Sequence, residues 1–91
     1  MRSEKEIDKA VNEFFDLVSY ERKLVMFANI QDGTEEMPDR ETYDKIIKAM
    51  DEIKKCTGYS GVENDFEWGM INGKLSALRW VLGDEWDFLD T

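Results

Sequence analysis

The sequence predicts an all-α fold: a small three-helix bundle with a short C-terminal tail docked on it, which we expect to dimerise. Apolar residues recur every three or four positions in three segments, and this spacing places them on one face of a helix. The chain of 91 residues has one proline, and four of its six glycines fall outside these segments. A chain of this length is expected to form one helical domain, residues 1–91.

The first helix is predicted to begin at Ser3 and to end near residue 31. Ser3 and Glu6 have the spacing of a capping box, in which each side chain accepts a hydrogen bond from the backbone N–H of the other residue. The apolar stripe that follows consists of Ile7, Ala10, Val11, Phe14, Leu17, Val18, Leu24, Val25, Phe27 and Ala28.

One charged residue interrupts this stripe. Glu21 falls between Val18 and Val25, on the side of the helix that is expected to be buried. Two interpretations stay open. Either this end of the stripe is exposed, or Glu21 has a partner from another helix, such as Lys74 or Arg79.

The second helix is predicted over residues 39–57, with one narrow apolar stripe and a charged outer side. Pro38 is expected in its first turn, where a missing N–H costs little. Gly58 follows the last turn, where glycine commonly ends a helix. Two acid–base pairs four residues apart are expected on the outer side: Asp44 with Lys48, and Asp51 with Lys55.

The third helix, predicted over residues 66–82, is the one around which we expect the others to pack. It is apolar over much of its circumference, which is typical of a helix buried on several sides. Asn64 or Asp65 can cap its start, and Gly83 its end. One face is formed by Ile71, Leu75, Leu78 and Leu82.

Small residues line a second strip of this helix, because Gly69, Gly73 and Ala77 lie four positions apart. Each interior glycine costs about 1 kcal/mol relative to alanine, which suggests a compensating gain. Close packing inside the monomer, a helix pair across a dimer interface, and a ligand against the bare backbone would each provide one.

The C-terminal segment, Asp84–Thr91, is too short to fold alone, yet it contains Trp86, Phe88 and Leu89. These side chains are expected to dock on the bundle or on another chain. Aromatic residues are enriched at interfaces, and three tryptophans exceed what a small core needs. The candidate interface residues are therefore Gly69, Gly73, Ala77, Trp80, Trp86 and Phe88.

The last 19 residues, GKLSALRWVLGDEWDFLDT (Gly73–Thr91), resemble the C-terminal ends of small uncharacterised proteins from microbes and their phages. The resemblance covers about a fifth of the chain. No activity is attached to that group, so the resemblance implies no catalytic residue.

The chain is acidic, with a net charge of −9 from 21 acidic and 12 basic residues. This charge disfavours direct contact with nucleic-acid phosphates and with anionic membrane surfaces. It would attract a basic protein partner. The N-terminus has no apolar run typical of a signal peptide, and no segment is apolar for long enough to span a membrane. We therefore expect a cytoplasmic protein.

The residues available for catalysis are few. The chain has no histidine and one cysteine, Cys56, which excludes histidine-based triads and clusters of cysteine around a metal. We predict no catalytic residue, no cofactor and no metal site, and we do not expect an enzyme.

The sequence thus favours a protein–protein interaction or regulatory module that acts as a homo-oligomer. One alternative is a phage-type inhibitor that mimics the charge of nucleic acid and binds to the basic site of a DNA- or RNA-binding protein. A second is a magnesium-dependent, all-α nucleotide pyrophosphohydrolase, for which Glu13 with Asp16 and Glu63 with Glu67 offer carboxylates at helical spacing. The E-E-x-x-E and E-x-x-D pattern of those enzymes is not reproduced.

Overall fold

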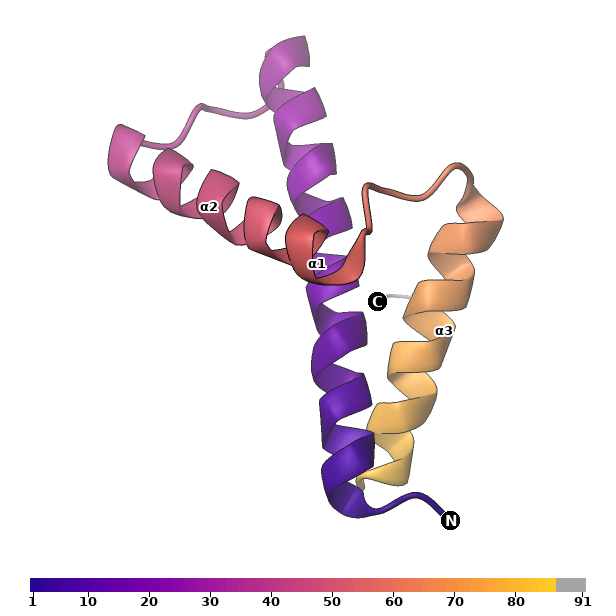
Figure 1. Ribbon diagram of the computed structural model, residues 1–91. Helices are drawn as coiled ribbons and strands as arrows, with labels where there is room; N and C mark the ends of the chain where they lie inside the picture. Colours follow the sequence, from indigo (N-terminus) through magenta and orange to yellow (C-terminus); the bar gives the residue numbers. More distant parts are fainter. Residues whose placement is uncertain (87–91) are drawn as a thin grey trace. The chain divides into compact units, whose positions relative to one another are not determined.

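The computed structural model describes residues 1–86, and this part of the chain consists of three helices without strands (Figure 1). Helix α1 spans Glu4–Asp32, α2 spans Arg40–Thr57 and α3 spans Asp65–Val81. The predicted all-α class is confirmed, and each predicted helix boundary lies within one residue or so of the observed one.

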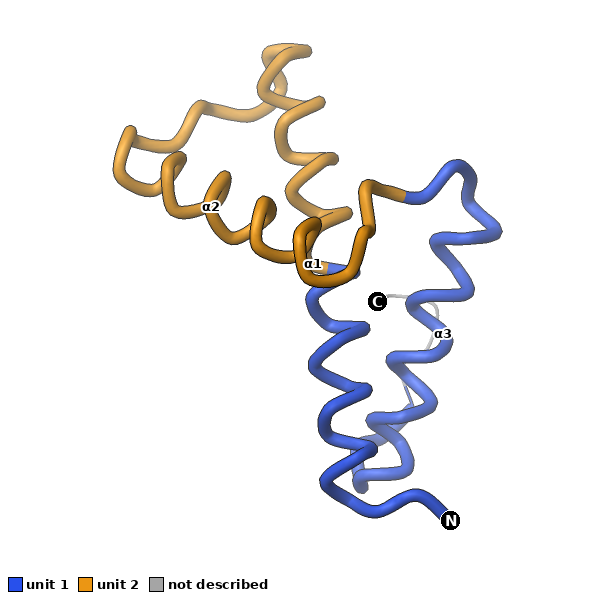
Figure 2. Tube along the Cα trace, viewed as in Figure 1, with its two compact units in different colours: residues 1–18, 62–91 blue, residues 19–61 orange. Residues whose placement is uncertain are grey.

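The helices form two compact units, which Figure 2 shows in different colours. Unit 1 contains Met1–Val18 and Val62–Thr91, and therefore pairs the N-terminal part of α1 with α3. Unit 2 contains Ser19–Gly61, and pairs the C-terminal part of α1 with α2. Each unit is described by itself below.

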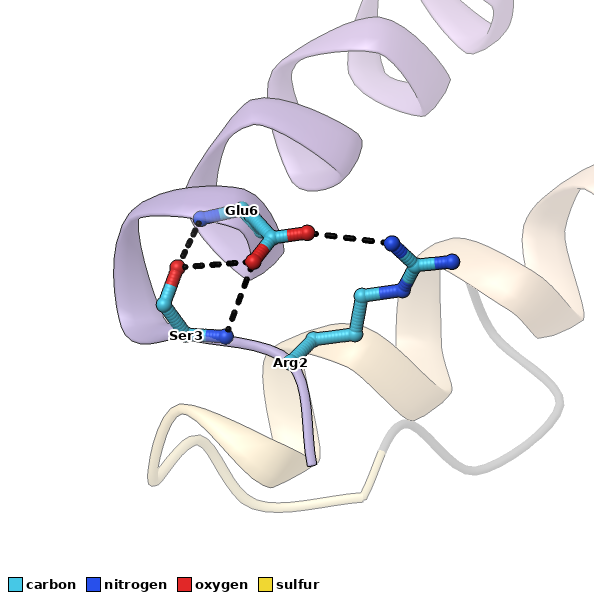
Figure 3. A network of polar contacts seen from close by, with 3 residues as sticks. All are labelled: Arg2, Ser3 and Glu6. Carbon is cyan, nitrogen blue, oxygen red and sulfur yellow. Dashed lines mark hydrogen bonds and ion pairs between the residues drawn. The ribbon is translucent and has the colours of Figure 1, made fainter.

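Helix α1 begins at the predicted capping box, whose bonds are drawn in Figure 3. The Glu6 N–H donates to Ser3 Oγ at 3.1 Å, and the Ser3 N–H donates to Glu6 Oε1 at 3.4 Å. Arg2 Nη1 adds an ion pair to Glu6 Oε2 at 3.0 Å. The Arg2 guanidinium, with the hydrogen bonds from Ser3, holds the pKa of the Glu6 carboxyl below its ordinary value.

Helix α2 begins one residue later than predicted, because Asp39 is its N-cap. Asp39 Oδ1 accepts a hydrogen bond from the Thr42 N–H at 2.8 Å, and hydrogen bonds from Thr42 lower the pKa of this carboxyl. Pro38 therefore precedes the cap, and its predicted place in the first helical turn is wrong. The helix ends at Gly58, which adopts a φ of 73° that only glycine reaches without strain.

The ion pairs on the outer side of α2 differ in part from the prediction. Lys55 pairs with Asp51 at 3.3 Å, as expected. Asp44 instead accepts from Arg40 at 3.2 Å, one turn before it, rather than pairing with Lys48. All these side chains are exposed, so each pair contributes only a few tenths of a kcal/mol.

Helix α3 has a defined cap at each end. Asn64 Oδ1 accepts from the Glu67 N–H at 2.9 Å at its start. At its end the Gly83 N–H donates to the Trp80 carbonyl and the Asp84 N–H to the Arg79 carbonyl, both at 3.0 Å. This pair of bonds, with a φ of 107° at Gly83, is a Schellman motif and fulfils the predicted role of that glycine.

In unit 1, α3 runs back alongside the N-terminal part of α1 (Figure 2). Leu75 of α3 and Val18 of α1 are its buried apolar residues in the described part of the chain. Two cations cover aromatic rings at the edge of this packing. Lys74 Nζ lies 5.7 Å from the centre of the Phe14 ring, and the Arg79 guanidinium lies 5.9 Å from that of Phe15.

In unit 2, two side chains of α1 are buried, Tyr20 and Glu21. The ring of Tyr59, from the segment after α2, meets the Tyr20 ring edge-on with centroids 5.4 Å apart. Tyr59 Oη also donates a hydrogen bond to Glu21 Oε1 at 2.5 Å. Gly61 lies close by, where an added Cβ would come within 3.3 Å of Leu24 and would strain a backbone with a φ of 126°.

The apolar stripe predicted for α1 is only partly correct. Its N-terminal half is buried or half-buried in unit 1, but Val25 is 58% exposed and Ala28 is exposed in unit 2. The residues of α1 that unit 2 covers are instead Tyr20, Glu21 and, in part, Phe27, whose ring lies 5.9 Å from that of Tyr43. The pattern changes because the two halves of α1 pack against different helices.

None of the described helices is long and apolar enough to cross a membrane.

Candidate interaction surface on helix α3

Helix α3 presents apolar side chains on two of its sides. The inner side is the predicted one, and within unit 1 it packs toward α1. Leu75 is buried and Ile71 and Leu78 are half-buried, whereas Leu82, beyond the last helical turn, is exposed. The other side, which we name the outer α3 face, consists of Phe66, Gly69, Met70, Gly73, Ala77, Trp80 and Val81.

All seven residues of the outer α3 face are exposed. Phe66 is 76% exposed and Trp80 is 50% exposed, which are high values for aromatic side chains in a folded unit. The seven positions are separated by one, three or four residues, so they form one continuous stripe along the helix. The stripe contains no charged residue. An exposed helix side without charge is unusual, since solvated helix faces are normally polar.

The two glycines leave the middle of this face open. Among the described residues, no atom lies within 4 Å of a Cβ built on Gly69 or on Gly73. The interpretation that the small-residue strip packs closely inside the monomer is therefore wrong for residues 1–86. Within residues 1–86, no close contact at this strip offsets the cost of the two interior glycines.

A pair of indole rings extends the outer α3 face beyond the end of the helix. Trp86 stacks on Trp80 with ring centroids 5.0 Å apart and planes inclined by 13°. Both residues remain about half exposed, so their stacked rings still present a broad apolar surface. Phe88, the last of the predicted interface residues, lies outside the described residues.

The size of this surface can be compared with that of known interfaces. An aromatic side chain offers about 150–250 Å². At their observed exposures, Phe66, Met70, Trp80, Val81 and Trp86 therefore expose on the order of 500 Å² of mainly apolar area. A standard interface buries about 800 Å² on each partner. The surface is thus large enough to form the apolar centre of such an interface, with polar residues around it.

Five of the six predicted interface residues are brought together by the structure: Gly69, Gly73, Ala77, Trp80 and Trp86. Sequence reasoning missed Phe66, Met70 and Val81 as members of the same face. Their spacing from the glycines contained this information, because each lies three or four positions from a small residue.

The carboxylates considered for magnesium do not gather. Glu13 and Asp16 are exposed on α1, and Glu67 Oε1 accepts the Glu63 N–H at 2.9 Å at the start of α3. Residues 1–86 contain no group of three or more acidic or cysteine side chains placed to hold a metal ion. The geometry therefore gives the pyrophosphohydrolase alternative no support.

Comparisons of the chain with protein-family models, with curated proteins and with solved structures give no match. The resemblance of Gly73–Thr91 to the ends of small microbial and phage proteins therefore stays a prediction from the sequence.

Proposed function

We propose that this protein is an interaction module that associates with a second copy of itself through the outer α3 face. The observation that supports this most strongly is the combination of exposed aromatic side chains, two glycines with open space above them, and the absence of charge. A two-fold axis would place the same face on both copies, so that the Gly69–Gly73 backbones cross and the aromatic residues surround the crossing.

The apolar area of the outer α3 face supports this proposal. Two copies would together remove on the order of 1,000 Å² of apolar surface from water, a gross gain of about 25 kcal/mol at 25 cal/mol per Å². Association costs about 4–15 kcal/mol in lost translation and rotation, and further energy in ordered side chains. Only the surplus of the gain over these costs appears as affinity, and the glycine strip alone would provide much less apolar area.

The arrangement of charge favours this proposal over nucleic-acid mimicry. A mimic requires rows of uncompensated carboxylates. On α2, however, three acidic side chains form ion pairs with basic residues one turn away: Asp44 with Arg40, Glu41 with Lys45, and Asp51 with Lys55. A basic protein partner and a cytoplasmic location remain predictions from the sequence.

The test is the mass of the protein in solution, measured by light scattering behind a sizing column over a range of micromolar concentrations. The wild-type chain should have the mass of a dimer. Ala77→Glu places a charge in the centre of the outer α3 face and should give a monomer that keeps its helical circular-dichroism spectrum, because this position is exposed.

Ala28→Glu is the matched control, since it makes the same substitution at an exposed alanine of α1 in unit 2. It should leave the dimer intact. A wild-type chain that is monomeric at all these concentrations would overturn the proposal. So would a dimer that Ala77→Glu weakens no more than Ala28→Glu does.

A further inference from the structure

Unit 2 contains a small apolar pocket, whereas the outer α3 face belongs to unit 1. The pocket is lined by Tyr20 of α1 and by apolar side chains of α2 that include Ile46, Met50 and Ile53. The chain does not fill this space in the described residues, and none of the α2 side chains is fully buried. The pocket is thus open to a group from outside unit 2.

The volume of the pocket, about 200 Å³, restricts what it can hold. Pockets for drug-sized molecules measure about 300–1,000 Å³. An apolar cavity of about 150 Å³, by contrast, is known to accept one benzene molecule. The pocket therefore has the size of a single aromatic side chain, a type of group that is enriched at protein interfaces.

Charge around the pocket restricts the flanking residues of such a peptide. Lys23 of α1 and Lys45 of α2 both line it, and no acidic residue does. Lys23 has no ion pair within residues 1–86. Lys45 pairs with Glu41 at 3.3 Å, but both of these side chains are more than three-quarters exposed, so the pair is weak and can be exchanged. The pocket fits an aromatic side chain with carboxylates on either side of it.

We propose that this pocket binds the C-terminal segment of a second copy of the chain, with Phe88 as its anchor. The segment Asp84–Thr91 has acidic residues around its aromatic ones and no basic residue. Trp86 is the less suitable anchor, because it stacks on Trp80. The positive charge that would complement this segment is local to the pocket, where Lys23 and Lys45 are the charged lining residues.

This inference rests on the proposed self-association, which raises the concentration of one copy's C-terminal segment near another copy. It adds a second, polar contact whose strength depends on salt, since exposed charges are screened over about 10 Å at 0.1 M ionic strength. The two contacts can be tested separately, because the segment can be supplied as a free peptide.

The experiment titrates the full-length chain into a fluorescein-labelled peptide, DEWDFLDT, and follows the fluorescence anisotropy. The full-length chain has the Phe88→Ser substitution, so that its own C-terminal segment does not compete. Saturable binding that weakens with added salt is expected. The peptide with Phe88→Ser keeps every charge but should lose binding, and a peptide with all four acids changed to their amides should bind more weakly at low salt.

Substitutions in the pocket decide where the peptide binds. Lys23→Glu with Lys45→Glu should weaken binding by at least about fivefold, because two charge pairs are removed and replaced by repulsion. Lys48→Glu with Lys54→Glu is the matched control, with the same change of net charge at two α2 residues outside the pocket. Equal effects of the two double variants, or no saturable binding, would overturn the proposal.

Two further readouts separate the possible results. Peptide binding should persist in the Ala77→Glu background, so a failure of self-association through α3 would be distinguished from a failure of the pocket. The methyl chemical shifts of Ile46 and Ile53 in the wild-type chain should differ from those in the Phe88→Ser chain at high concentration, and this difference should disappear on dilution as the dimer dissociates. If the difference persists on dilution, the pocket is filled by the C-terminal segment of the same chain, and the proposal that a second copy provides the segment is overturned.

Discussion

The hydroxyl of Tyr59 donates a 2.5 Å hydrogen bond to the carboxylate of Glu21, although 38 residues separate them in the sequence. Glu21 is only 7% exposed, in a unit whose core is otherwise small. A buried carboxylate is tolerated when hydrogen bonds satisfy it, and it then fixes the position of the groups that provide those bonds. The contact thus holds the segment after α2 against α1.

Removing the Tyr59 hydroxyl should destabilise the protein. Tyr59→Phe deletes a donor to a buried charged group, for which a loss of about 1.5–3 kcal/mol in the free energy of unfolding is typical. Urea denaturation followed by circular dichroism measures it. Tyr43→Phe is the control, because no hydrogen bond of the Tyr43 hydroxyl is present within residues 1–86. Equal losses in the two variants would show that the Glu21 contact contributes nothing of its own.

The double variant Glu21→Leu with Tyr59→Phe completes a thermodynamic cycle. Its loss of stability should be smaller than the sum of the losses in the two single variants, because either change alone breaks the same contact. Strict additivity would contradict a direct coupling between the two side chains.

Two glycines of the chain should respond in opposite ways to the same substitution. Gly73→Ala should stabilise the isolated chain by up to about 1 kcal/mol, because the new Cβ meets open space and alanine is the better helix former. Gly58→Ala should destabilise it by about 1–2 kcal/mol, since its φ of 73° is unfavourable for any residue with a Cβ. Chemical denaturation at submicromolar concentration measures both.

At higher concentration, Gly73→Ala should also weaken self-association, because the Cβ would separate the two backbones that cross at this position. Sedimentation equilibrium of the variant and the wild-type chain provides the dissociation constants. A variant that is less stable at low concentration would instead indicate a close neighbour inside the monomer.

The parts of the fold that the sequence predicts well are those that depend on local interactions. The capping box of Ser3 and Glu6 and the helix end at Gly83 each involve atoms within a few residues of one another. Such contacts have characteristic sequence spacings. For the same reason the Lys55–Asp51 ion pair was predicted correctly.

The parts that were missed depend on which helix a given face meets. The spacing of apolar residues shows which sides of α3 are apolar. An apolar side has the same spacing whether it faces the core or the solvent, so the spacing does not distinguish the two. The sequence therefore leaves open whether the glycine strip packs inside the monomer, across a dimer interface or against a ligand, and the structure shows that it is exposed. Glu21 was expected at an exposed end or beside a cation, because nothing in the spacing of α1 points to Tyr59.

Acid should weaken the starts of two helices. The pKa values of Glu6 and Asp39 lie below their ordinary values of 4.5 and 3.8, because both carboxylates accept hydrogen bonds in the folded chain. The resulting stabilisation is present above those ordinary values and is lost as the pH falls through the lower, folded-state values. The melting temperature of the wild-type chain should therefore decrease as the pH is lowered below about 4.5.

The double variant Glu6→Gln with Asp39→Asn tests the assignment. Glutamine and asparagine keep the capping hydrogen bonds but do not titrate, so the melting temperature of the variant should decrease less steeply over this range than that of the wild type. Glu35→Gln with Glu36→Gln makes the same change of charge in the connection between α1 and α2. If this control flattens the profile as much, the caps are not the cause.

The stacked tryptophans should give a spectroscopic signature of their own. Two indoles 5.0 Å apart and inclined by 13° are close enough for their electronic transitions to couple, which produces a paired positive and negative band in circular dichroism. Trp86→Ala should abolish this signal and cost about 0.5–1.5 kcal/mol of stability or less, given that both rings are half exposed. Trp68→Phe is the control and should keep the paired band, because Trp68 is not part of the stack.

The same band should change on dimerisation, since the stack extends the outer α3 face. A signal that stays constant across the monomer–dimer transition would place Trp80 and Trp86 outside the interface.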